Sequence, residues 1–193
     1  MNMPFVPLVV PLVVESVSSF VVGLLLWTLL EYVLHRFGGH QRAFGAAVSR
    51  EHLNHHARPD TFSTLARKAM LAVPVLTTLF VLVALCAGLV TAVALTAGTS
   101  AGWCFYEHLH RATHVRPPRN AYGAWARKHH LFHHFASPRK NHGVTTPLWD
   151  WVFRTLEVPE VIVVPRRQVH AFAWLLDDEG ELASRFSAGY RLG

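Results

Sequence analysis

The strongest constraint on this chain is a stretch of 38 residues, Ala69 to Tyr106, without a charged side chain. One helical membrane crossing needs about 20 mostly apolar residues, so two crossings joined by a tight turn fit this stretch. Gly88 is a candidate turn residue, although the turn could fall elsewhere between Cys86 and Gly98. Gly98 and Gly102 form a small-xxx-small pair, which either packs membrane helices closely or is incidental in a chain with 12 glycines.

A second apolar stretch, from about Phe5 to Leu34, precedes this hairpin. It predicts one further membrane helix from Ser16 to Leu34, while Pro7 and Pro11 favour an interfacial or re-entrant start. Apolar residues make up 51% of the 193-residue chain and charged residues 16%, whereas soluble domains are about 25% charged. The expected fold is therefore an all-α integral membrane protein with about three transmembrane helices, one plus a hairpin.

Basic residues indicate which side of the membrane the polar segments face. They lie on either side of the predicted hairpin, and its tip has none, so the polar segments are expected to face the cytoplasm as a helical cap. The net charge of +6 then suits anionic lipid headgroups, and no nucleic acid is expected because no aromatic-basic stripe accompanies the charge. The basic residues are Arg36, Arg42, Arg50, Arg58, Arg67, Lys68, Arg111, Arg116, Arg119, Arg127, Lys128, Arg139 and Lys140.

Ten of the 14 histidines fall into four clusters within these polar segments. Positions i, i+3 and i+4 share one face of a helix, so three of the clusters each direct their rings to one side. The first pair is five residues apart, and the glycines at 38 and 39 predict a break after the helix that turns His40 back toward the others. The clusters are His35 and His40; His52, His55 and His56; His110 and His114; and His130, His133 and His134.

Ten imidazoles are too many for one metal ion and suit two ions with five nitrogens each. Five nitrogens leave one octahedral position open, which favours two iron ions that use O2, although zinc can replace iron in purified samples. Neutral imidazoles do not balance the metal charge. Carboxylates are therefore expected to accept the outer ring N–H groups, and the candidates are Glu31, Glu107 and Asp150.

These motifs resemble the fatty acid hydroxylase/sterol desaturase superfamily of histidine-box membrane di-iron proteins. The resemblance covers about residues 20–156 in order and spacing. It includes a closing segment, Asn141 to Thr155, in which His142 and Arg154 depart from the usual pattern. The matching stretches are EYVLHRFGGH from Glu31, EHLNHH from Glu51, YEHLHRATH from Tyr106, HHLFHHF from His129 and NHGVTTPLWDWVFRT from Asn141.

The resemblance implies an O2-dependent hydroxylase or desaturase that acts on a lipid such as a fatty acyl chain. The ten histidines would be the metal ligands, and electrons would come from a separate donor of cytochrome b5 or ferredoxin type. A carotenoid or sterol hydroxylase or desaturase would use the same centre. A membrane metal-binding or transport protein is an alternative of another class, but the stretch from Ala69 to Tyr106 has no histidine or acid to line a path.

The expected organisation is one membrane domain over residues 1–193. Its core covers about residues 20–156, and residues 157–193 form a C-terminal cytosolic tail, with a short strand within Val158–Val164 and a turn at Asp177–Gly180. The membrane would be the plasma membrane in a bacterium or the endoplasmic reticulum in a eukaryote.

Overall fold

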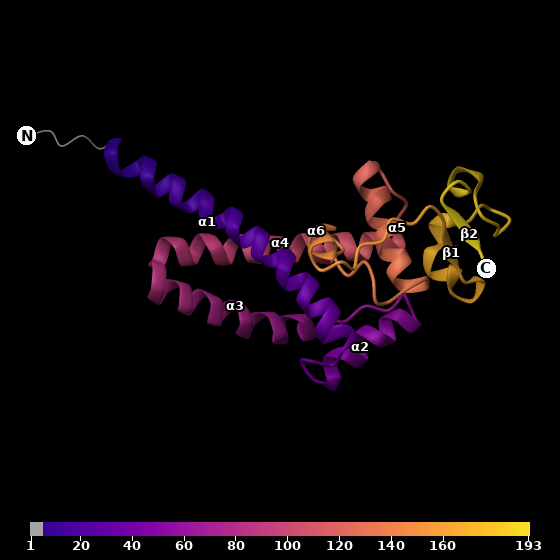
Figure 1. Cartoon of the computed structure of the whole chain (residues 1–193), viewed down its shortest axis with the longest axis horizontal. Coiled ribbons are helices and arrows are strands. Elements are labelled where there is room, and N and C mark those ends of the chain that lie inside the picture. The colour runs from indigo at the N-terminus through magenta and orange to yellow at the C-terminus, as the bar shows by residue number, and fades with distance from the viewer. Residues whose placement is uncertain (1–5) are drawn as a thin grey trace, which may run out of the picture. The chain divides into compact units, whose positions relative to one another are not determined.

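A computed structural model describes residues 6–193 and is mainly helical (Figure 1). The chain forms two compact units, each built from separate stretches of sequence. The membrane unit contains the residues up to Leu29 together with Ser63–Phe105, and the histidine unit contains Leu30–Phe62 and Tyr106–Gly193. The single-domain boundaries drawn from the sequence stay a prediction.

Three helices are long and apolar enough to cross a membrane, over Val9–His40, Leu65–Ala87 and Leu89–Val115. The first span covers most of α1 (Val6–Val33) and the π-helical segment that continues it. The other two spans are α3 (Leu65–Ala87) and α4 (Leu89–Val115). None of the α3 residues is buried by the rest of the protein, as expected for a helix whose surroundings are lipid. The predicted one-plus-hairpin arrangement is thus confirmed, except that α1 begins at Val6 and continues through Pro11 without a re-entrant break.

Gly88 is the turn of the predicted hairpin, between α3 and α4 (Figure 1). Its φ of 89° lies in the left-handed region that glycine adopts without strain. Gly98 and Gly102 do pack helices closely, but against α1. A Cβ atom on Gly98 would lie 2.1 Å from the Phe20 carbonyl oxygen, and one on Gly102 would lie 2.6 Å from Trp27 Cβ.

The histidine unit is built from short helices and one small sheet. After α1 come η1 (Leu34–His40), a π-helix, and α2 (Ala46–Ala57); after α4 come α5 (Ala121–Phe135) and α6 (Leu148–Val152). The C-terminal residues form β1 (Ile162–Val164), two 3-10 helices, η2 (Arg166–Leu175) and η3 (Ser184–Phe186), and β2 (Tyr190–Leu192).

The C-terminal tail is folded rather than extended. Strands β1 and β2 pair in parallel, with Val163 opposite Arg191, so the expected short strand is present at Ile162–Val164. The predicted turn is also present, because the Gly180 amide donates to the Asp177 carbonyl. A buried apolar cluster joins the tail to α5 through Leu131, Phe172, Leu175 and Tyr190.

Candidate metal centre

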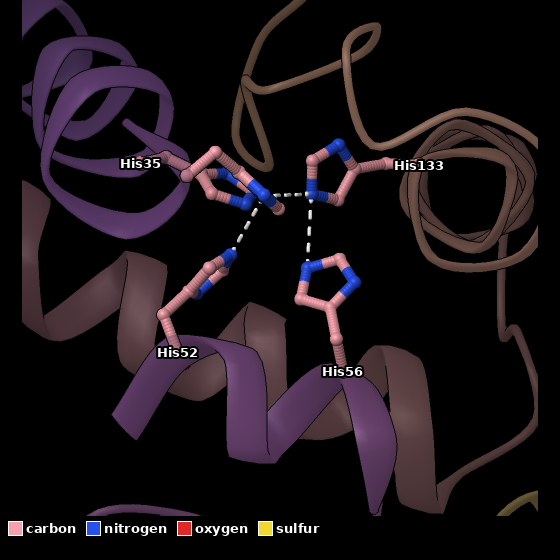
Figure 2. Close-up of side chains that lie close together, drawn as sticks. His35, His52, His56 and His133 are labelled. Atoms are coloured by element: carbon pink, nitrogen blue, oxygen red, sulfur yellow. Dashed lines mark hydrogen bonds between the residues drawn. The ribbon is translucent and has the colours of Figure 1, made fainter. Parts of the chain in front are cut away.

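The structure brings all ten clustered histidines together, in two groups of five. Within each group, one nitrogen from each ring lies within 4.8 Å of every other. Figure 2 shows four rings of the first group directed toward one another from η1, α2 and α5. Group 1 is His35, His40, His52, His56 and His133, and group 2 is His55, His110, His114, His130 and His134.

Helices α2 and α5 each supply both groups. On α2, His55 joins group 2 while His52 and His56 join group 1. Adjacent residues on an α-helix point about 100° apart, so a cluster of three spreads around its helix enough to reach two neighbouring sites. The shared face predicted for the clusters on α2 and α5 is thus wide enough to supply both groups, whereas His110 and His114 lie in one group.

His35 and His40 are brought together by a π-helix instead of a chain break. In a π-helix the hydrogen bonds run from i to i+5, so residues five apart lie near one face, and the two rings are 5.5 Å apart between centroids. The prediction that His40 lies beyond the helix, after a break, is wrong. Gly39 instead permits close packing of α2, because a Cβ on Gly39 would lie 2.6 Å from His52 Cδ2, and Gly38 packs against Phe44, which precedes α2.

The nitrogens of group 1 make more close contacts than hydrogen bonds alone can satisfy. His40 Nε2 lies 2.9 Å from both His52 Nε2 and His133 Nε2. His133 Nδ1 contacts the Lys140 carbonyl at 2.7 Å and must donate its proton there, so the Nε2 of a neutral His133 ring carries a bare lone pair. That lone pair also faces His56 Nε2 at 3.1 Å.

Group 2 repeats this arrangement. His130 Nε2 lies 2.9 Å from His114 Nε2 and 3.1 Å from His134 Nε2, and one nitrogen cannot bond both partners as a donor. Two nitrogens at about 2.1 Å from a metal ion and at right angles to each other would be about 3.0 Å apart. The residues present therefore fit two metal ions bound by imidazole.

Burial keeps these rings in the neutral form that binds metals. Loss of solvation, together with the neighbouring histidines, lowers the pKa of the His56 imidazole to about 3. The same cause holds the pKa values of His133, His130 and His134 well below their usual range. At neutral pH these imidazoles are uncharged, with lone pairs available to a cation.

Backbone carbonyls, rather than carboxylates, accept the outer N–H groups of three rings. His35 Nδ1 bonds the His142 carbonyl, His133 Nδ1 that of Lys140, and His55 Nδ1 that of Thr61 at 2.8 Å. Sequence reasoning missed these acceptors because a carbonyl occurs at every residue and leaves no signal in residue type. Such bonds fix the ring orientation and the tautomer of a metal ligand.

The three predicted carboxylates have different outcomes. Glu31 is buried and accepts hydrogen bonds from the Val144 amide and from the amide and hydroxyl of Thr145, so its predicted bond to a ring is wrong. Glu31 affects the His35 ring indirectly. It holds the segment that contains the His142 carbonyl, and this carbonyl orients His35. Glu107 is half-buried on α4, and its role stays a prediction.

Asp150 is fully buried and forms hydrogen bonds with several residues of the segment from Asn141 to Thr155. Its carboxylate accepts from the His142 and Gly143 amides, both at 2.8 Å, from the Thr155 hydroxyl at 2.7 Å, and faces His129 Nε2 at 3.3 Å. Burial alone would raise the pKa of Asp150, but these hydrogen bonds outweigh burial and lower it. Asp150 therefore contacts His129, which lies outside both groups, instead of a candidate ligand.

Residues 20–155 match the family model described as fatty acid hydroxylase. A dihydroceramide fatty acyl 2-hydroxylase of Arabidopsis thaliana is 36% identical over 138 residues, which are 69% of this chain and 58% of that relative. A fatty acid 2-hydroxylase of Rattus norvegicus is 34% identical over 166 residues, 79% of this chain and 42% of that relative. The chain thus spans about half the length of these relatives.

A solved structure is also similar. It is described as full-length scs7p with only the hydroxylase domain visible, and it is 28% identical with a TM-score of 0.63. The match covers 76% of this chain and 58% of that one. Sequence and structure agree, and the chain belongs to the fatty acid hydroxylase family.

Proposed function

We propose that this protein is a membrane-bound enzyme that uses O2 and two iron ions to hydroxylate the acyl chain of a fatty acid or ceramide-type lipid. The observation that carries the proposal is the pair of five-imidazole groups, buried or partly buried, in a chain of this family. The relatives named above are 2-hydroxylases, so carbon 2 of the acyl chain is the proposed position. Electrons would come from a separate protein of cytochrome b5 or ferredoxin type.

The histidines of group 1 and group 2 would hold one iron ion each. Iron bound in this way would supply the oxygen chemistry that breaks a C–H bond of the acyl chain. The protein contributes neutral nitrogen ligands, carbonyls that fix three rings, and burial of most of the histidines. On α4, the Tyr106 ring stacks on His110 with centroids 5.5 Å apart and restricts the motion of that ring.

Metal transport is less consistent with the structure. A transporter needs polar or ionisable side chains along a path within its membrane helices. From Ala69 to Tyr106, across α3 and most of α4, the chain has neither a histidine nor an acid. The histidines lie in the histidine unit, where five-nitrogen groups suit a bound cofactor.

Lipid analysis of a host that expresses the protein tests the proposal. The wild type should produce a 2-hydroxylated acyl lipid, and both His133→Ala in group 1 and His134→Ala in group 2 should abolish it. His108→Ala is the matched control, because His108 is exposed on α4 and outside both groups, and it should retain the product. Unchanged product in both group variants would overturn the proposal.

A further inference from the structure

The two groups differ in how the outer nitrogens of their rings are held. In group 1, His35 and His133 donate to backbone carbonyls. In group 2, only His55 is seen to bond a carbonyl in this way, and the Nδ1 atoms of three other rings are buried and have no hydrogen-bond partner within residues 6–193; these are His114, His130 and His134. A ligand ring without this bond relies on packing for its orientation. Group 2 therefore depends more than group 1 on the side chains around it.

The C-terminal segment, residues 157–193, supplies part of that packing. Phe172 in η2 is fully buried, and its ring lies 5.3 Å from the His114 ring and 5.5 Å from the Phe135 ring. Phe172 belongs to the apolar cluster that ties β1, η2 and β2 to Leu131 of α5. The position of this aromatic ring against His114 is thus set by the whole C-terminal fold.

The same segment holds the backbone at the end of α4, where His114 is the penultimate residue. The last carbonyls of a helix have no partner within it. The Trp174 indole N–H donates to the His114 carbonyl at 2.8 Å. Arg127 of α5 also donates to carbonyls at this helix end, those of Ala112 and Arg116. Its guanidinium lies 5.7 Å from the Trp174 ring centre.

We propose that Trp174 and Phe172 are positioning residues for the group 2 metal. Trp174 fixes the backbone of His114 and Phe172 fixes its ring, in place of the outer hydrogen bond that this histidine lacks. Both residues lie beyond the family match, which ends at residue 155. The inference rests on the proposed metal centre and makes a claim about one of its two sites only.

Zinc release from the full-length chain tests this claim, with a coloured chelator as the readout. In a His133→Ala background only group 2 is intact, and Trp174→Phe, which removes the N–H but keeps an aromatic ring, should speed zinc release about tenfold. In a His110→Ala background only group 1 is intact, and the same change should leave the release rate unaltered. Trp151→Phe is the control, because Trp151 is 68% exposed, and it should change neither rate.

Equal release rates with and without Trp174→Phe in the His133→Ala background would overturn the inference. Equal acceleration in both backgrounds would also overturn it, because that result indicates general loosening of the fold. Phe172→Leu, which removes the ring beside His114, carries the same expectation and replaces Trp174→Phe if that variant does not fold. If zinc release is unaffected while the wild type still hydroxylates lipid, the proposed function stands and only the positioning role fails.

Discussion

At the scale of single residues, spacing predicted that the ten clustered histidines converge, but it did not predict the hydrogen-bond partners of Glu31 and Asp150. A histidine on α2 or α5 is placed by the local helix, so its face follows from sequence. Glu31 bonds residues more than 100 positions away, at Val144 and Thr145, and local patterns hold no information about such partners. Glu31 and Asp150 hydrogen-bond the segment that follows the last histidine cluster, and the role of Glu107 stays a prediction.

Substitution Glu31→Gln tests this indirect role. The amide would place an N–H₂ group where a carboxylate oxygen now accepts hydrogen bonds, in a site that is 3% exposed. We expect a loss of about 1–3 kcal/mol in the free energy of unfolding, measured by denaturation of the purified protein in detergent. Glu179→Gln on the exposed turn of the C-terminal segment is the control, and an equal effect of both changes would contradict the role of Glu31.

At the scale of elements, the π-helix η1 is the feature that the sequence did not predict. The five-residue spacing of His35 and His40 does not fit one face of an α-helix, and a break was the simpler explanation. The wider turn of a π-helix brings His35 and His40 near one face without interrupting the helix. Gly39 then lets α2 approach closely. Helical spacing predicted α2 and α5 correctly because those segments have regular geometry.

Substitution Gly39→Ala tests the close approach of η1 and α2. The added methyl would lie 2.6 Å from His52 Cδ2, so the His52 ring must move out of group 1. We expect the purified variant to lose the group 1 metal and keep the group 2 metal, as measured by elemental analysis. Ala47→Ser, which adds one atom at an exposed position of α2, should keep both. Full metal content in Gly39→Ala would show that the contact is not required.

At the scale of the whole molecule, the apolar stretches predicted the membrane helices, and Gly88, one of the turn positions that the sequence allowed, is the turn of the hairpin. The fold of the C-terminal tail was less predictable. Its core joins short elements far apart in sequence, such as Ile162 and Tyr190, to Leu131 of α5. A strand of three residues has too little periodicity to reveal its partner, so only the presence of β1 could be expected from sequence.

The central claim is that ten histidines form two separate five-nitrogen metal sites, and metal content per chain tests it most directly. After expression in iron-replete medium, elemental analysis of the wild type should give about two metal ions per chain, from ten ligands shared by two ions. His133→Ala and His134→Ala should each give about one. A wild-type content of one metal or none would contradict the account.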